Sequence, residues 1–372
     1  MGMPETPSVL VLRGESTALA LAEAQALGFH THERHGRLAV GAYAETLGAA
    51  AGVDAILDAG GLLPWTSNEA LIAHMAERVR PRQGRVCVRV ERLGGRMGES
   101  STQAIARGLG GHLHDAGCTI DLEHPEHVLC VFLDATSQHV GWGWDVPRAE
   151  RHGIGARRAG ERPFFRPVSL DPHLARTAVN LALGSRDGVV LDAMTGTGGF
   201  LIEGALMGHD TVAMDLDPMM VEGASANLEW ALEGRAHRAS VVLGDATALP
   251  DSLPESAQGR IAGLVLDPPY GRNSHGSHGP WDLLARVLAS AAEVVGQQGA
   301  GCCLILPVKP FSTEADGSVP TTAMVEPLHG TWSDVVDLFE ASSWELAAER
   351  WSVRVHGSLA RLILHATCAP PN

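Results

Sequence analysis

The sequence Asp267-Pro268-Pro269-Tyr270 follows the apolar run 261–266 and brings a carboxylate, two rigid prolines and an aromatic ring together. An amino group on a nucleobase is a weak nucleophile because its lone pair is delocalised into the ring. A carboxylate and a proline carbonyl can accept its two N–H bonds, which concentrates the lone pair and aims it in line. The prolines hold that carbonyl in place, and the tyrosine can stack on a base turned out of its stack. We predict these four residues to be catalytic; the alternative is an ordinary turn with an incidental tyrosine.

Three further acids follow earlier apolar runs, at Asp192, Asp215 and Asp245. The glycines after the first acid let the backbone approach a ligand at a helix N-terminus. The second acid can hold two ribose hydroxyls, and the third can accept a hydrogen bond from an adenine amino group. Each signal is weak alone, but the ordered series matches methyltransferases that use S-adenosylmethionine (SAM). The residues predicted to bind this cofactor are Asp192, Thr195, Gly196, Gly198, Asp215, Asp245 and Ala246.

These motifs allow other interpretations. A glycine-rich turn followed by an acid also occurs in NAD-dependent oxidoreductases, but their fingerprint requires glycine where this chain has Leu201. Asp217 precedes Pro218 and is interpreted as a helix N-cap rather than as a ligand. The six cysteines form no Cys-x-x-Cys pair, and nothing completes a ligand set around the neighbouring histidines, so no metal site is predicted.

The elements that position these residues follow from hydrophobic periodicity. In residues 169–372 apolar strands alternate with helices, which predicts an α/β fold with a mostly parallel, doubly wound sheet. Ligands of such sheets bind beyond the carboxyl ends of the strands, where the four acids lie. Residues 1–58 and 59–147 each predict a smaller α+β unit, and the Arg-, Gly- and Pro-rich segment 148–168 predicts a linker. Within the first unit, the alanine-rich segment 45–60 predicts a helix.

Charge is distributed unevenly along the chain, which carries 28 Lys and Arg against 43 Asp and Glu. Residues 1–165 hold 16 arginines and 19 acids, whereas residues 166–372 hold the other 12 basic and 24 acidic side chains. Arginine is concentrated at 78–96 and at 148–166. Guanidinium groups bind phosphate oxygens and stack on bases, so these stretches predict nucleic-acid binding; a solvated face paired with local acids is the alternative.

The motifs together resemble a known family, the archaeal THUMP-domain tRNA guanine N2-methyltransferases that act at position 10 of tRNA. The resemblance spans most of the chain and is strongest at 162–273. It is carried by RPFFRP (162–167), LARTAVNLA (174–182), LDAMTGTGGFLIEGALMG (191–208), MDLDPMMVEGASANLEW (214–230), GDATALP (244–250), DPPYGRN (267–273) and VHGSLARLIL (355–364).

The resemblance implies a layout and a set of roles. Residues 1–58 would be a ferredoxin-like domain, 59–147 a THUMP domain that binds the tRNA acceptor end, and 169–372 a Rossmann-type methyltransferase domain with a seven-stranded sheet. Asp267 and the Pro268 carbonyl would hold guanine N2. Where the family usually has Pro-Phe-Cys, this chain has Ala-Met-Thr at 193–195, which bears on how the methionine end of SAM sits. The residues expected to line the RNA channel are Arg157, Arg158, Arg162, Phe164, Phe165 and Arg166.

The resemblance predicts a cytoplasmic, monomeric enzyme with tRNA as its partner; some relatives also work with a small zinc-binding activator protein. The sequence contains no run of about 18 apolar residues, so no membrane span is predicted. The first residues have no basic stretch followed by an apolar one, so no secretory signal is predicted. Two other functions stay open at this point. An adenine N6-methyltransferase acting on RNA or DNA also uses Asp-Pro-Pro-Tyr, and an RNA-binding protein could keep the fold without catalysis.

Overall fold

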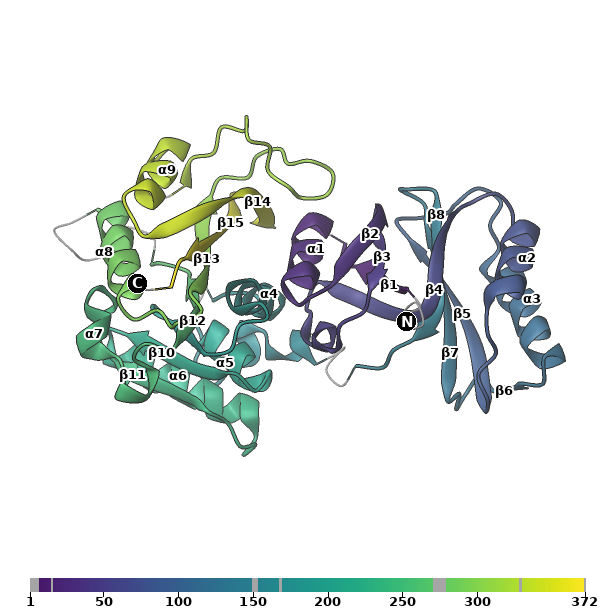
Figure 1. Cartoon of the computed structure of the whole chain (residues 1–372), viewed down its shortest axis with the longest axis horizontal. Helices are drawn as coiled ribbons and strands as arrows, with labels where there is room; N and C mark the ends of the chain where they lie inside the picture. Colours follow the sequence, from purple (N-terminus) through teal and green to yellow (C-terminus); the bar gives the residue numbers. More distant parts are fainter. Residues whose placement is uncertain are drawn as a thin grey trace. The chain divides into compact units, whose positions relative to one another are not determined.

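The computed structural model describes residues 7–14, 16–148, 153–166, 169–269, 279–327 and 330–370. The chain divides into two compact units (Figure 1). The first comprises residues 1–48 and 52–149, and the second comprises residues 49–51 and 150–372. Among the described residues, no helix combines the length and the apolar composition needed to cross a bilayer.

The N-terminal unit is built on one eight-stranded mixed sheet with the strand order β2-β3-β1-β4-β8-β7-β5-β6. β5 runs parallel to β6 and β7, and the other neighbours are antiparallel. Its elements are β1 (Ser8–Leu12), α1 (Thr17–Ala26), β2 (His30–His35), β3 (Leu38–Ala42), β4 (Val53–Pro64), α2 (Asn68–Arg78), β5 (Arg85–Leu93), α3 (Thr102–Asp115), β6 (Thr119–Ile120), β7 (His127–Asp134) and β8 (His139–Asp145).

The segment 45–60 corrects one expectation from the sequence. Alanine-rich composition predicts a helix there, but only a 3-10 turn forms, at Glu45–Ala49, before the chain enters β4. β4 pairs with β1 on one side and β8 on the other, so its β-branched Val53 and Ile56 lie in a sheet interior. Tertiary pairing overrides the local helix propensity at this place.

The strand β4 also spans the junction between residues 58 and 59, where the sequence predicts a domain boundary. Both predicted α+β units therefore contribute strands to one sheet. The helices α2 and α3 cover one end of it through Met75, Ile105 and other buried side chains. Ser67 caps α2 by accepting from the Ala70 N–H at 3.2 Å, as its position before the helix predicts. The division into ferredoxin-like and THUMP domains stays a prediction.

The C-terminal unit has a seven-stranded sheet of order β11-β10-β9-β12-β13-β15-β14. Its strands are parallel except β15, which is antiparallel to both neighbours. The predicted doubly wound, mostly parallel α/β sheet is thereby confirmed. Its elements are α4 (Pro172–Leu183), β9 (Val189–Asp192), α5 (Gly199–Leu206), β10 (Asp210–Asp215), α6 (Pro218–Leu232), β11 (Ala239–Leu243), α7 (Leu249–Ser252), β12 (Ile261–Leu266), α8 (Pro280–Ala292), β13 (Ala300–Val308), α9 (Trp332–Glu340), β14 (Trp344–His356) and β15 (Leu359–Cys368).

Helices cover both faces of this sheet (Figure 1). α4, α5 and α6 pack on one face, and α7, α8 and α9 on the other. α4 lies very close to the sheet because Gly263 and Gly301 present no side chain: a Cβ on Gly301 would come within 2.2 Å of the Ala182 carbonyl oxygen. The strand order reverses between β9 and β12, and a crevice opens at their carboxyl ends, where ligands of open α/β sheets bind.

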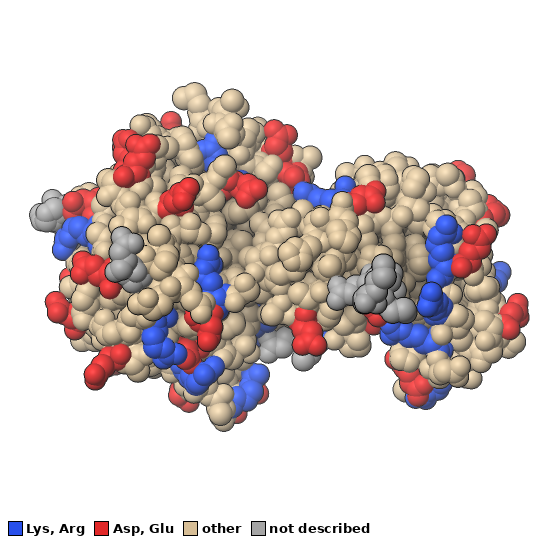
Figure 2. All heavy atoms as spheres, viewed as in Figure 1, with Lys and Arg blue, Asp and Glu red and all other residues tan. Residues whose placement is uncertain are grey.

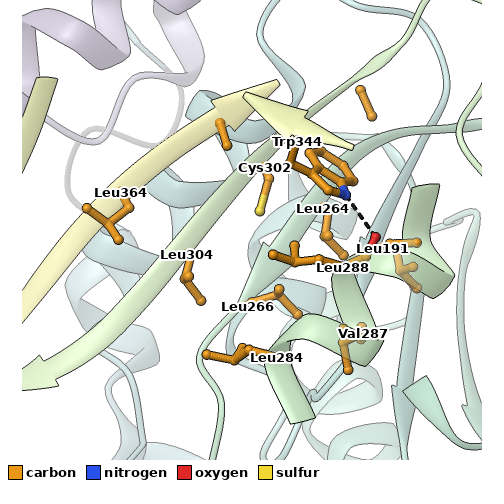
Figure 3. Close-up of a cluster of buried hydrophobic side chains, with 14 of the residues drawn as sticks. Leu191, Leu264, Leu266, Leu284, Val287, Leu288, Cys302, Leu304, Trp344 and Leu364 are labelled. Atoms are coloured by element: carbon orange, nitrogen blue, oxygen red, sulfur yellow. Dashed lines mark hydrogen bonds between the residues drawn. The ribbon is translucent and has the colours of Figure 1, made fainter. Parts of the chain in front are cut away.

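The core on the α8 face combines aliphatic side chains from four parallel strands with Trp344 of β14. Figure 3 shows the indole of Trp344 lying against Cys302, Leu264 and Leu288. Trp344 is 2% exposed, and its Nε1–H donates to the Leu288 carbonyl at 2.9 Å. This bond ties the edge strand β14 to α8, the helix that borders the crevice.

Replacing Trp344 by Phe is expected to lower the free energy of unfolding by about 1–3 kcal/mol, because the buried Leu288 carbonyl loses its second, side-chain donor and a small void remains. Urea denaturation of the full chain measures this loss. The matched control is Trp281→Phe at the start of α8, where the indole is only partly buried. Equal effects of both substitutions would contradict a special role for the Trp344 bond.

Candidate active site

A cavity of about 760 Å³ lies at the carboxyl ends of β9, β10, β11 and β12. Its volume falls within the range of small-molecule sites. Every strand end that carries a predicted acid borders it, so the four motifs meet in one place. It is lined by Arg166, Ser169, Leu170, Ala193, Met194, Thr195, Gly196, Thr197, Gly199, Phe200, Asp215, Leu216, Asp217, Met220, Gly244, Asp245, Ala246, Thr247, Asp267, Pro268, Pro269, Gly279, Pro280, Leu283 and Arg286.

The glycine-rich turn between β9 and α5 forms one wall of the cavity. Gly196 and Gly198 have φ angles of +51° and +80°, a backbone region that favours glycine. The Thr195 N–H donates to the Met214 carbonyl at 2.8 Å, which fastens the turn to β10. Gly198 is the N-cap of α5, so the positive end of that helix faces the cavity wall. This arrangement suits the close approach of a ligand with negative character.

Asp192 supports this turn from below and is not part of the cavity wall. The residue is fully buried, and its Oδ2 accepts from Thr195 Oγ1 at 2.7 Å. Its Oδ1 has no hydrogen-bond partner within the described part of the chain. Burial raises the pKa of Asp192 to about 7; the Thr195 hydroxyl opposes this rise, whereas the neighbouring carboxylates of Asp215 and Asp267 add to it. The predicted cofactor ligand is thus a support of the loop in this structure.

Asp215 lies at the end of β10 with its carboxylate at the cavity surface. Oδ2 accepts from the Gly196 N–H at 2.9 Å, and Oδ1 accepts from the Asp217 N–H at 3.0 Å. The two bonds fix the carboxylate while its remaining lone pairs stay available to a pair of hydroxyl groups. Asp217 itself caps α6 by accepting from the Met219 N–H at 2.9 Å, which confirms its interpretation as an N-cap.

Asp245 and Ala246 follow β11 and line the cavity opposite the glycine turn. Oδ1 of Asp245 accepts from both the N–H and the hydroxyl of Thr247 at 2.8 Å. Arg286 of α8 donates to the same hydroxyl at 2.9 Å, which holds this loop against the helix. An exposed carboxylate oriented in this way can accept a hydrogen bond from an amino group on a ligand.

Asp267 follows β12, and its two oxygens differ in their surroundings. Oδ2 accepts from Arg361 Nη1 at 2.7 Å, whereas Oδ1 is buried and has no hydrogen-bond partner within the described residues. Burial raises the pKa of Asp267, and the Arg361 guanidinium acts in the opposite direction. Pro268 and Pro269 line the cavity beside it. The fourth predicted catalytic residue, Tyr270, lies outside the described residues.

The predicted linker 148–168 contains residues that pack inside the C-terminal unit. Arg157 donates through Nε and Nη2 to the two oxygens of Glu203 at 2.8 Å each, and Arg176 donates to the same carboxylate at 2.8 Å. Glu203 is fully buried, and Arg162 is 5% exposed. Arg162 Nε donates to the Arg157 carbonyl at 2.9 Å. Arg157 and Arg162 are thus interior residues, whereas Arg158 is exposed.

The residues after Arg162 contact α6 and reach the cavity. Phe164 packs on Gly223 of α6, where a Cβ would come within 2.1 Å of its ring. Asn227 accepts from the Phe164 N–H at 2.8 Å and donates to its carbonyl at 2.7 Å and to the Thr197 carbonyl at 2.9 Å. Phe165 is 52% exposed. Arg166 lines the cavity, with its guanidinium 5.1 Å from the Phe164 ring centre.

Several residues of this site were not assigned a role from the sequence. Apolar wall positions such as Leu216 and Met220 carry no chemical signal of their own. Arg361 lies in the segment VHGSLARLIL, which resembles the family. The resemblance does not predict the ion pair of Arg361 with Asp267. Among the described residues, no group of three or more His, Cys, Asp and Glu side chains is arranged to hold a metal ion.

Comparisons with known proteins agree with this geometry. Residues 159–327 match the family described as RMKL-like, methyltransferase domain. These residues are therefore similar to a methyltransferase domain. The match contains the glycine turn and all four strand-end acids, and it begins inside the segment that the sequence suggested as a linker.

Named relatives point in the same direction. The chain is 33% identical over 187 residues to the tRNA (guanine(10)-N2)-dimethyltransferase of Pyrococcus abyssi. The aligned region covers 50% of this chain and 54% of that protein. It is 28% identical to the enzyme of that name from Methanothermobacter thermautotrophicus over 74% of this chain and 71% of the relative. The chain thus spans about half the length of the Pyrococcus relative. These matches confirm the resemblance to the family that the motifs suggested.

One solved structure, TrmN from Thermus thermophilus, aligns over 97% of this chain and 99% of its own, with a TM-score of 0.49 and 19% identity.

The residues present fit SAM, the cofactor that the motifs predict. The positive end of α5 behind a glycine turn suits its carboxylate, Asp215 suits its ribose hydroxyls, and Asp245 suits its adenine amino group. The buried carboxylates beside the turn suit a ligand that carries a positive sulfonium. The assignment of single atoms to these residues stays a prediction.

Asp192→Asn is expected to stabilise the ligand-free chain at pH about 8. A pKa raised to about 7 in the folded chain means that stability falls as pH rises from about 4 to about 7. Asparagine keeps an acceptor for Thr195 and removes this loss, which is on the order of 4 kcal/mol. Calorimetric unfolding at pH about 5 and about 8 measures the effect, and a variant-to-parent difference that does not grow with pH would contradict it.

Proposed function

We propose that this protein is a SAM-dependent tRNA methyltransferase that methylates the exocyclic N2 of a guanosine. The proposed site is position 10, with N2-methylguanosine as product and N2,N2-dimethylguanosine where a second transfer follows. The observation that carries this proposal is Asp267 Oδ1: a buried carboxylate oxygen without a partner among the described residues, on the wall of the cofactor cavity. An unpaired buried acceptor is costly, and a donor on a ligand removes that cost.

The chemistry requires an acceptor pair for the target amino group. Asp267 Oδ1 and the Pro268 carbonyl accept the two N–H bonds of N2 and aim its lone pair in line with the methyl group. Bound SAM supplies an electrophilic methyl group on a sulfonium sulfur. The N2 lone pair forms the new N–C bond while the C–S electron pair returns to sulfur. Asp267 then receives the N2 proton that is lost, and solvent takes it from the carboxylate.

The choice of guanine and of tRNA rests on the relatives. The two archaeal proteins matched over half or more of this chain carry the name tRNA (guanine(10)-N2)-dimethyltransferase. A yeast tRNA (guanine(10)-N(2))-methyltransferase matches 41% of the chain at 24% identity. The polar clamp at Asp267 by itself serves an adenine amino group equally well, so identification of the methylated nucleoside is the deciding measurement.

The N-terminal unit is the proposed tRNA-binding part, with residues 59–147 as a THUMP domain. Figure 2 shows basic side chains, all of them arginine in this unit, forming a stripe on the face in view. Arg80 and Arg89 are exposed, and β5 presents Arg89 on the side of the sheet opposite Val88 and Val90, which pack against α2 and α3. Exposed guanidinium groups on a sheet surface suit the phosphates of a folded RNA.

Three side chains are proposed to meet RNA near the cofactor cavity: Arg158, Phe165 and Arg166. The first two are exposed, and the third lines the cavity. The interior residues Arg157, Arg162 and Phe164 are left out because their functional groups pack within the domain. We further propose a cytoplasmic monomer; a small zinc-binding activator protein is a candidate partner if the isolated chain binds SAM but stays inactive.

Transfer of labelled methyl groups from SAM to unmodified tRNA tests the proposal, followed by nuclease digestion and nucleoside mass spectrometry. N2-methylguanosine or its dimethyl form is the expected product, and fragment mapping then gives its position. Label in N6-methyladenosine would overturn the target base. Absence of label from every RNA offered, with and without a candidate activator, would overturn the proposed activity.

Asp267→Asn is expected to lower the rate of methyl transfer at least about 100-fold, because a charged acceptor aimed at the reacting amino group is lost. SAM affinity, measured by calorimetric titration, should change little. Asp251→Asn on α7, an exposed acid outside the cavity, is the matched control. Full activity of the Asp267 variant would contradict the proposed mechanism.

The double substitution Arg80→Glu and Arg89→Glu is expected to weaken tRNA binding about ten-fold at low salt and to reduce the salt dependence of binding. Filter binding over a range of salt concentrations measures both. Arg354→Glu, an exposed arginine of β14, is the control, and SAM binding should be unchanged in both proteins. Unchanged tRNA affinity in the double variant would exclude this surface.

A further inference from the structure

The buried ion pair between Arg361 and Asp267 joins two segments that are 94 residues apart in the chain. Arg361 Nη1 lies 2.7 Å from Asp267 Oδ2, and the two side chains are only 5% and 16% exposed. Placing charges at such a site is costly in free energy, and a buried pair is weak evidence for stability alone. A charge pair at the wall of the reaction cavity therefore calls for a functional explanation.

The sheet determines how Arg361 reaches the acid. β12 is parallel to β13, with Leu266 opposite Leu304, and β13 is antiparallel to β15, with Pro307 opposite Arg361. Arg361 thus stands on the second strand away from Asp267 and extends across β13. The residues of β13, AGCCLILPV, carry no charge, so the guanidinium meets the carboxylate with no competing ion from the strand between them.

The pair divides the two oxygens of Asp267 between separate tasks. Oδ2 is held by the guanidinium, and this leaves Oδ1 buried without a partner among the described residues. A carboxylate with one oxygen fixed cannot rotate freely, so the position of the second oxygen is fixed as well. Oδ1 is the oxygen that the proposed reaction needs as an acceptor.

The charge state of Asp267 is the second consequence. Arg361 from β15 and Asp192 from β9 interact with Asp267 electrostatically, and Asp215 of β10 and Arg286 of α8 line the same cavity. Burial raises the pKa of Asp267 and Arg361 lowers it. A protonated acid would turn one oxygen into a donor and lose the proton-accepting role, so the cation keeps the group in the required form.

We propose that Arg361 is a positioning residue for methyl transfer: it holds Asp267 ionised and turns Oδ1 toward the target amino group. This inference rests on the proposed function, since it assigns a task to the acid that holds the nucleophile. The role fits Arg better than Lys, because a planar guanidinium remains charged and keeps its donor directions when buried. Arg361 itself touches neither substrate nor cofactor and acts through Asp267.

The experiment compares Arg361→Met and Arg361→Lys with the unaltered chain and with Arg354→Met, the exposed arginine on the partner strand. Single-turnover methyl transfer to tRNA is measured between pH about 6 and pH about 9, together with SAM affinity and thermal unfolding. The methionine variant removes the positive charge. The lysine variant keeps the charge but loses the planar guanidinium group with its fixed donor directions.

In Arg361→Met the acid limb of the rate profile should move to higher pH, because removal of the cation raises the pKa of Asp267. At pH about 6 the rate should fall about 10- to 100-fold, with partial recovery at pH about 9. Arg361→Lys should keep the acid limb near that of the unaltered chain and lower the rate at every pH. SAM affinity should stay within about two-fold in both variants.

Three outcomes separate the hypotheses. If the unaltered chain transfers no methyl group to RNA, the proposed function fails and this inference fails with it. If the unaltered chain is active and Arg361→Met keeps both its rate and its pH profile, the inference alone is overturned. If the folded fraction falls in the methionine variant, the lysine variant decides: an unchanged rate there overturns the positioning role.

Discussion

Burial of negative charge at the reversal of the strand order is the constraint on which this site depends. Asp192 and Asp267 end neighbouring strands, and the carboxylate of each lies largely out of water. Their charges repel, together with that of Asp215 on the next strand, and desolvation makes each ionised form more costly. The Thr195 hydroxyl stabilises the carboxylate of Asp192, and the Arg361 guanidinium stabilises that of Asp267. A ligand with a positive centre between these acids would relieve the repulsion further.

The segment before α4 contributes to this arrangement although it precedes the sheet. Through Asn227, one side chain of α6 holds both the Phe164 backbone and the Thr197 carbonyl of the glycine turn. Arg157 and Arg176 meet on the buried Glu203 of α5, which fastens the same segment to the helix that begins at the turn. The chain entering the domain thus supports the glycine turn beside the cavity, in line with a family match that begins at residue 159.

The excess of acidic over basic side chains in the C-terminal half is partly explained by this site. Part of the surplus lies on acids that touch the cavity or support its wall, and in the proposed function these acids face the cofactor rather than the RNA. Arginine is concentrated in the other unit and in the entering segment. The proposed function therefore assigns recognition of a polyanion and methyl transfer to different parts of the chain, and each part has the charge that suits its proposed ligand.

Local patterns determined much of this protein from the sequence. Strand-end acids, the glycine turn and the helix caps at Ser67 and Asp217 depend on neighbours within a few residues, and the alternation of strands and helices follows from side-chain burial. The segment 45–60 departs from its local helix propensity because its strand is stabilised by partners on both sides that lie far away in sequence. Only the tertiary structure decided that Asp192 supports the turn, that Arg157 is interior, and that Arg361 holds Asp267. The reason is that burial and ion pairing depend on contacts between distant segments, and residue type and spacing do not encode them.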